Sequence, residues 1–231
     1  MTEHELRSYA SGERRHRQNR SVRALALVPM LIFFACQWAS PPLYAAPKRA
    51  LVRWVNDGDT IVLVGGERVR YLGINAPEVA HEDQAAEPYG DRARSFNRSL
   101  VHRRWVRLKY TEQRRDHYGR LLACVFLEDG TFVNGELVRV GYAHLFRGQA
   151  EVCHWTRLLE LQRKALREKR GIWSIAAVRP ERVYFGNRRS WIFHRPDCAF
   201  ARKMGRTNLI RIKDRNRALY QGFSPCRRCR P

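Results

Sequence analysis

Two carboxylates flank a glycine in the stretch DGDT, where Asp57 and Asp59 interrupt residues that otherwise favour strand. Asp-Gly is a turn signal, and β-branched residues on both sides predict a tight hairpin. A hairpin turn needs one aspartate, to hold a positive φ or to accept a local hydrogen bond. The second carboxylate therefore requires a role beyond the turn.

A second set of chemically capable side chains lies near the C-terminus, in FHRPDCAFARKM and SPCRRCRP. The spacing H-x₃-C followed by C-x₂-C is typical of a zinc site. Its four ligands would be His194, Cys198, Cys226 and Cys229. A short domain with few large apolar residues needs a bound metal or a covalent cross-link to stabilise its fold. A disulfide among the three cysteines is the alternative, and an exported location would favour it.

The charge of the chain indicates its class of partner. The 231 residues carry 44 Lys and Arg against 22 Asp and Glu, a net charge of +22. Such an excess favours polyanions, nucleic acid first and anionic lipid second. Arg227 and Arg228, between the last two cysteines, are expected to lie against a nucleic-acid backbone. With 44% hydrophobic residues, the chain can bury a core, which excludes wholesale disorder.

The elements that must position these residues are short strands and a few helices. Period-2 runs predict strands at 50–55, 60–64, 67–74, 105–110 and 120–133, the last with a hairpin at Asp129-Gly130. Helices are expected at 88–104, at 134–143 with Asn134 as N-cap, and at 153–173 with Gly171 as stop signal. This order predicts a mainly β fold with α-helices, a five-stranded barrel of the OB type. We expect Cys124 to be a buried strand thiol.

The N-terminal residues 1–46 have the outline of an export segment. An arginine-rich stretch precedes residues 24–39, which carry no charge, and small residues follow near Ala45. The apolar run is short for a full membrane span, which needs ~20 residues. A cleaved signal peptide and an uncleaved anchor both remain open. The folded part of the chain that follows this segment is expected outside the cytoplasm, periplasmic, secreted or membrane-anchored.

Six motifs together carry a family resemblance: DGDT, RVRYLGINAPE, PYG, DHYGR, VNGELVRVGYA and EKRGIW. Their order and spacing resemble staphylococcal nuclease and the thermonuclease family over residues 49–174. The resemblance implies an OB-fold domain at 49–175 and calcium-dependent hydrolysis of DNA and RNA. Residues 183–231 are similar to the zinc-binding domain of the repair methyltransferase Ada. The Ada site is all cysteine, so the role of His194 is an inference from spacing.

The resemblance assigns a metal site and a general base. Asp59 matches the metal carboxylate of the family, and Ala76 stands where the family offers a backbone carbonyl. Asn75 replaces a usual aspartate, so a unit of negative charge is missing and weaker Ca²⁺ binding is expected. Glu78 matches the carboxylate that holds the attacking water.

Two arginines complete the implied chemistry. Arg70 and Arg120 match the catalytic arginines, whose planar guanidinium groups suit phosphate oxygens. Phe146 and Arg147 stand near the tyrosines that the family places beside the substrate. Phe146 could stack on a base, with core packing as an equal explanation.

Two classes of function follow from the sequence. The first is an exported, metal-dependent nuclease, expected to be a monomer, with Ca²⁺ and Zn²⁺ as cofactors and DNA or RNA as partner. The second is a non-catalytic OB-fold protein that binds nucleic acid. Because Arg70, Glu78 and Arg120 are all present, the sequence favours catalysis.

Overall fold

The computed structural model describes residues 48–82, 84–148, 151–176 and 179–231. These residues lie within one compact unit of the chain. The expected export segment at 1–46, with its apolar run at 24–39, falls outside them. None of the helices in the described part of the chain has the length and apolar character needed to cross a membrane.

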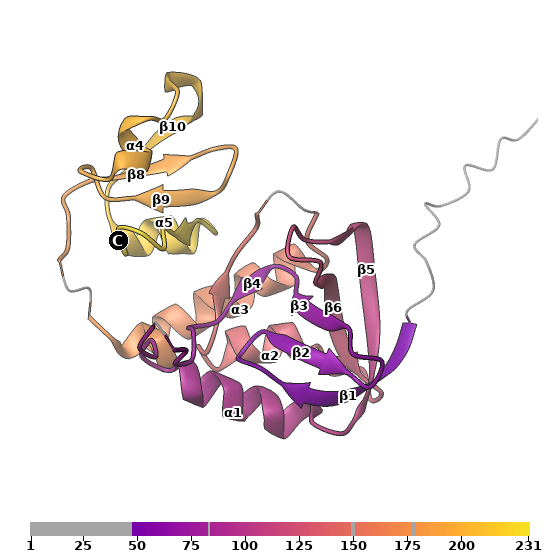
Figure 1. Cartoon of the computed structure of the whole chain (residues 1–231). Coiled ribbons are helices and arrows are strands. Elements are labelled where there is room, and N and C mark those ends of the chain that lie inside the picture. The colour runs from indigo at the N-terminus through magenta and orange to yellow at the C-terminus, as the bar shows by residue number, and fades with distance from the viewer. Residues whose placement is uncertain (1–47, 83, 149–150, 177–178) are drawn as a thin grey trace, which may run out of the picture. The chain divides into compact units, whose positions relative to one another are not determined.

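Five strands close into a barrel, as the sequence predicts (Figure 1). They are β1 (Lys48–Val55), β2 (Thr60–Leu63), β3 (Arg68–Tyr71), β5 (Trp105–Arg115) and β6 (Leu121–Leu127), in the order β1-β2-β3-β6-β5. The β3–β6 pair is parallel and the other pairs are antiparallel. Branched side chains such as Val52, Ile61 and Val69 fill the barrel, with 1% exposure or less. This interior fixes which face of each strand points inward.

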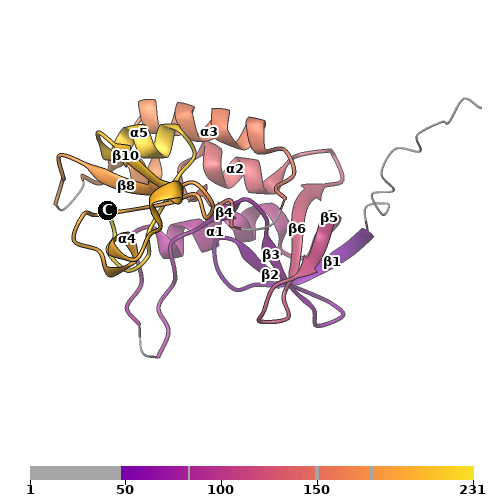
Figure 2. The ribbon, with the colours of Figure 1, turned by 90° about the horizontal axis from the view of Figure 1, so that it is seen from above.

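Three α-helices accompany the barrel in the described part of the chain, and both views show them gathered on one side of it (Figures 1 and 2). They are α1 (Gly90–Val101), α2 (Val133–Arg139) and α3 (Trp155–Arg167). α3 is shorter than predicted, since a separate 3₁₀ turn, η1 (Gly171–Ser174), follows it.

The predicted N-cap of α2 is wrong. The helix begins at Val133 with Phe132 as N-cap, and Asn134 lies inside it. The Asn134 side chain is fully buried, accepts from Val125 N at 2.9 Å and donates to Leu72 O at 2.9 Å. A buried amide is retained where it satisfies backbone groups of this kind. Asn134 thus ties the helix to β6 and to the residue that follows β3.

Two features near α3 differ from the prediction or escape it. Cys124 of β6 forms a disulfide with Cys153, which corrects the expectation of a free thiol. A small sheet pairs β4 (Ile74–Asn75) with β7 (His144–Leu145). Strands of two residues have no periodicity to detect, so the sequence offered no signal for this pair.

The C-terminal residues fold into a small module with its own sheet. Its elements are β8 (Tyr184–Asn187), β9 (Ile192–His194), α4 (Ala199–Arg202), η2 (Arg206–Asn208), β10 (Leu209–Ile212), α5 (Arg215–Tyr220) and β11 (Ser224–Pro225). The strand order is β10-β8-β9-β11. Tyr184, Phe193 and Leu219 pack in one buried cluster with Ala165 of α3 and Trp173. The module therefore shares an apolar core with α3.

Candidate active site

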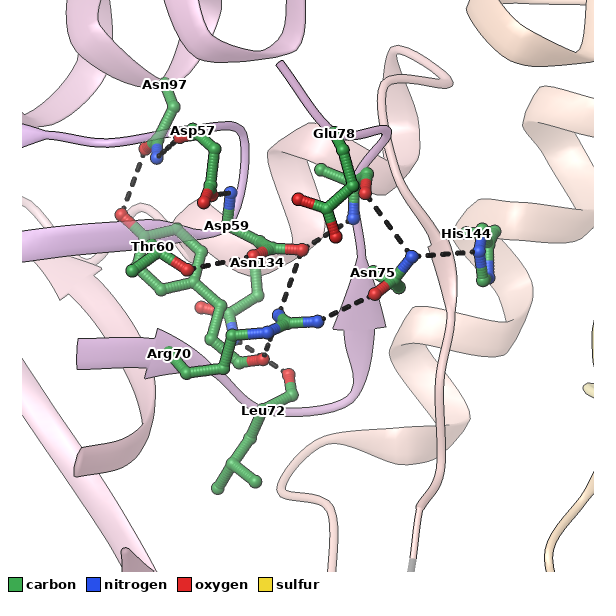
Figure 3. A network of polar contacts seen from close by, with 12 residues as sticks. Asp57, Asp59, Thr60, Arg70, Leu72, Asn75, Glu78, Asn97, Asn134 and His144 are labelled. Carbon is green, nitrogen blue, oxygen red and sulfur yellow. Dashed lines mark hydrogen bonds and ion pairs between the residues drawn. The ribbon is translucent and has the colours of Figure 1, made fainter. Parts of the chain in front are cut away.

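The DGDT turn gives its two aspartates different tasks (Figure 3). Asp57 Oδ1 accepts a hydrogen bond from Asp59 N at 2.8 Å, which shapes the turn. Asp59 Oδ1 accepts from Thr60 Oγ1 at 3.1 Å, and its Oδ2 accepts from Ala76 N at 2.6 Å. Burial, with the charge of Asp59 beside it, raises the pKa of Asp57 to about 7. Asp59 thus points away from the turn, toward the 74–78 segment.

Arg70 links Asp59 to Asn75 through a buried guanidinium group (Figure 3). Its Nη1 lies 3.0 Å from Asp59 Oδ2, and its Nη2 donates to Asn75 Oδ1 at 2.9 Å. The side chain of Arg68, two residues earlier, is exposed, whereas Arg70 is 8% exposed. Of these two arginines, Arg70 is the one that the family resemblance assigns to catalysis, and it lies against Asp59 and Asn75.

Asn75 is held in one orientation by His144 across the β4–β7 pair. His144 Nδ1 lies 2.8 Å from Leu145 O, so this nitrogen carries the proton and Nε2 is the acceptor. Asn75 Nδ2 donates to His144 Nε2 at 3.3 Å and to Ala76 O at 3.3 Å. Burial lowers the pKa of His144 to about 4, which keeps the imidazole neutral. The carbonyl oxygen of Asn75 therefore faces Arg70.

Glu78 lies beside this network and its carboxylate is partly exposed (Figure 3). Its backbone N–H donates to Glu87 Oε2 at 3.1 Å, which fixes the loop. Its Oε1 lies 2.9 Å from Nη2 of Arg227 in the C-terminal module. The same Nη2 donates to Asn75 Oδ1. A guanidinium group from the C-terminal module thus joins Arg70 in the group around Asn75.

Arg120 is placed by the hairpin between β5 and β6. Its Nε donates to Asp116 Oδ2 at 2.8 Å, and its guanidinium lies 5.3 Å from the ring centre of Tyr118. Gly119 takes a φ of +76° in this turn. Among the described residues, Arg120 contacts Asp116 and Tyr118 rather than the group around Asp59.

Phe146 and Arg147 follow β7 directly. Phe146 is 37% exposed, and its backbone N–H donates to Gly73 O at 2.9 Å. Arg147 lies over the rings of Trp155 and Trp191, at 5.4 and 4.7 Å from their centres. Arg147 is thereby engaged by two indoles, whereas Phe146 retains an exposed ring.

The oxygen atoms around Asp59 are of the kind that Ca²⁺ prefers. Asp59, Asn75 and the Ala76 carbonyl would hold the ion, and the hydrogen bond from Ala76 N to Asp59 keeps them adjacent. One of the three carries a formal charge. Asn75 Oδ1 also accepts from two guanidinium groups, so a cation would share this oxygen with Arg70 and Arg227.

The four predicted zinc ligands meet in the C-terminal module. One ligand atom from each of His194, Cys198, Cys226 and Cys229 lies within 4.8 Å of all the others. The three cysteines form no disulfide, contrary to the alternative prediction of a disulfide among them. The backbone N–H of Arg195 donates to Cys229 Sγ at 3.4 Å, a bond that suits a thiolate ligand. The donor set and its clustering fit Zn²⁺.

The contact of Arg227 with Glu78 had no sequence signal, because 149 residues separate them. Arg228 was predicted to bind substrate together with Arg227. Its guanidinium lies 5.9 Å from the ring centre of Phe200, within the module, and its contact with substrate stays a prediction. The two neighbouring arginines therefore point to different surroundings.

Comparisons with known proteins match the two parts of the chain to two different family models. The family model described as staphylococcal nuclease homologue matches residues 68–175, and that of the metal binding domain of Ada matches 178–231. A thermonuclease of Staphylococcus hyicus is 32% identical over 52% of this chain and 72% of its own length. An uncharacterized endonuclease of Escherichia coli O157:H7 is 33% identical over 67% and 94%. Endonuclease YncB of Bacillus subtilis is 34% identical over 56% and 64%.

Proposed function

The chain belongs to the family of staphylococcal nuclease homologues, and we propose that it hydrolyses the phosphodiester bonds of DNA or RNA. The observation that carries this proposal is the arrangement of Asp59, Arg70 and Glu78 at one side of the barrel. A phosphodiester is anionic, and its transition state gathers more negative charge. Fixed cationic donors beside a carboxylate suit that reaction.

In this mechanism Glu78 holds and deprotonates the attacking water. Its partly exposed carboxylate can reach a water from the open side of the site. Arg70, fixed by Asp59 and Asn75, binds phosphate oxygens through its planar donors. Arg120, whose Nε is held by Asp116, presents its remaining donors to the leaving oxygen. Ca²⁺, when bound, offsets the charge of the transition state.

Export is the second part of the proposal. The Cys124–Cys153 disulfide supports it, because disulfides persist in oxidising compartments. We propose a periplasmic, secreted or membrane-anchored nuclease, with the nuclease domain outside the cytoplasm. The net charge of +22 supports nucleic acid as the polyanion.

A non-catalytic, nucleic-acid-binding OB protein is the second candidate, favoured by Asn75 at a metal position. The test is incubation of the purified protein with plasmid DNA and with RNA, in Ca²⁺ and in EGTA. The nuclease proposal expects cleavage in Ca²⁺ that Glu78→Gln reduces by at least about 100-fold. Binding without cleavage, under all conditions, would favour the second candidate.

A further inference from the structure

One guanidinium from the C-terminal module enters the nuclease centre. Nη2 of Arg227 contacts both Glu78 Oε1 and Asn75 Oδ1. These contacts use the two protons of one amino group and leave three of the five N–H donors of an arginine. The side chain is 68% exposed, and the described residues provide no hydrogen-bond partner for those three donors. They are available to an anion in front of the site.

The chain on either side of Arg227 is anchored to β7 and to the loop that carries Glu87. Ser224 Oγ donates to Leu145 O at 2.7 Å, and Ser224 is 1% exposed. Leu145 belongs to β7, which pairs with β4 and therefore with Asn75. On the other side, Arg230 Nη2 lies 3.3 Å from Glu87 Oε1. Arg227 is thus bracketed by two contacts and held against the strand that carries its own acceptor.

A buried glutamine adds a further anchor between the two parts. Gln162 of α3 accepts from Leu145 N at 2.8 Å and donates to Leu219 O of α5 at 2.7 Å. Gln162 is 1% exposed, so parting these groups would leave buried polar atoms unpaired. The module is docked by specific bonds as well as by its apolar core.

Arg227 stands within the segment that carries two of the clustered metal ligands. We call Cys226–Cys229 the metal knuckle, in which Arg227 and Arg228 stand between two of the four clustered ligands. A tetrahedral ion would fix both cysteine sulfurs, and with them the short backbone segment between them. Metal loading would therefore position Arg227 at the nuclease centre.

Because the amide at position 75 is uncharged, it leaves the positive charges of Arg70 and Arg227 available to attract phosphate. An aspartate there would pair with Arg70 and Arg227 and reduce their attraction for phosphate. Asn75 Oδ1 orients both guanidinium groups without neutralising them. The added arginine, Arg227, thus contacts the side-chain oxygen of the same residue, Asn75, that replaces the expected metal carboxylate.

We propose that Arg227 is a third arginine of the nuclease centre, which binds a substrate phosphate beside Glu78 and is positioned by the metal knuckle. This inference rests on the proposed nuclease function. Arg227 takes the role of a catalytic residue, whereas the knuckle acts through it. The opposing possibility is that Arg227 blocks Glu78 and inhibits the enzyme.

The test compares Arg227→Ala, Arg227→Lys and a control, Arg211→Ala, in the full chain. Arg211 is exposed on β10 of the same module, so its loss removes the same charge. Arg227→Ala should lower kcat/KM by about 100-fold, Arg227→Lys less, and Arg211→Ala little. Without added Ca²⁺, and with zinc retained, the salt slope of oligonucleotide binding should fall by about one unit in Arg227→Ala alone. Thermal unfolding should show that all variants fold.

Metal dependence is tested on the same proteins in excess Ca²⁺. A zinc-selective chelator should lower kcat/KM of the native chain toward that of Arg227→Ala and change Arg227→Ala little, and added Zn²⁺ should restore the native value. A native chain that keeps its rate after zinc loss would overturn the role of the knuckle.

A faster Arg227→Ala enzyme would show that Arg227 inhibits the enzyme. Kinetics and a salt slope like those of Arg211→Ala would remove Arg227 from the site. A native chain that cleaves nothing contradicts the nuclease proposal, and the salt slope still decides whether Arg227 contacts phosphate.

Discussion

At the scale of single residues, Asn75 is the departure from the family motif that has the largest structural consequence. Its Nδ2 donates to Ala76 O and to the unprotonated Nε2 of His144. Its Oδ1 accepts from Arg70 and Arg227. The amide therefore supplies two N–H donors that an ionised carboxylate lacks, in addition to an acceptor oxygen. The residue proposed as a calcium ligand thus also has a structural role.

Asn75→Asp should lower the Ca²⁺ concentration needed for half-maximal activity, because it restores a charged ligand. It should also destabilise the calcium-free protein, because a carboxylate oxygen would face the lone pair of His144 Nε2. The measurements are a calcium titration of the initial rate and thermal unfolding in EGTA, with Asn75→Ala as control. An Asp variant that needs as much calcium as the native chain would show that Asn75 is not a ligand.

Arg70 and Arg120 should respond differently to removal, although both are assigned to catalysis. Arg70 is buried against Asp59, so Arg70→Ala leaves an uncompensated buried charge worth about 3–5 kcal/mol of stability. Arg120 pairs with Asp116 nearer the surface, so its loss should change stability by about 1 kcal/mol or less.

We expect Arg120→Ala to lower kcat by about 100-fold or more while the unfolding temperature stays close to native. Arg70→Ala should lower both kcat and the unfolding temperature. The comparison uses kcat together with thermal denaturation of each variant. Near-native hydrolysis by Arg120→Ala would show that this arginine does not act on the substrate.

At the scale of elements, the barrel could be predicted because its strands carry clear period-2 patterns and Asp-Gly turns. Alternation alone does not select Arg70, because Arg68 and Arg70 share the face of β3 opposite to the buried Val69. The register of the family motif identified Arg70. Asn134 misled the prediction, since an asparagine before an apolar helix resembles an N-cap, whereas tertiary contacts with Leu72 and Val125 decided its place. Contacts such as Arg227 with Glu78 depend on how distant segments pack, and local sequence carries no record of that.

The disulfide between β6 and the start of α3 gives a prediction for these elements. Cys124 and Cys153 are 29 residues apart, and closing a loop of this length stabilises a protein by about 3–4 kcal/mol in the chain-entropy model. Reductant should therefore lower the unfolding temperature of the native protein. A Cys124→Ala, Cys153→Ala variant should start lower and be unaffected by reductant. Equal unfolding temperatures for all four samples would show that the bond contributes nothing.

At the scale of the whole molecule, α3 and the C-terminal module share an apolar core. Ala165 of α3 and Trp173 pack with Tyr184, Phe193 and Leu219 of the module. The module is also rich in arginine, so the same docking that completes the core adds positive charge near the proposed substrate path. Binding of nucleic acid should consequently weaken steeply with salt.

This coupling predicts where the structure loosens when zinc is removed. A structural zinc site supplies much of the folding free energy of a small module, so chelation should unfold residues 179–231 first. Unfolding of α5 would leave Gln162 without Leu219 O and expose the face of α3 around Ala165. Hydrogen exchange should therefore accelerate in the module and in the α3 amides near Gln162, while β5 and β6 stay protected. A sample chelated and then reloaded with zinc is the control, and unchanged α3 protection alongside an unfolded module would contradict the shared core.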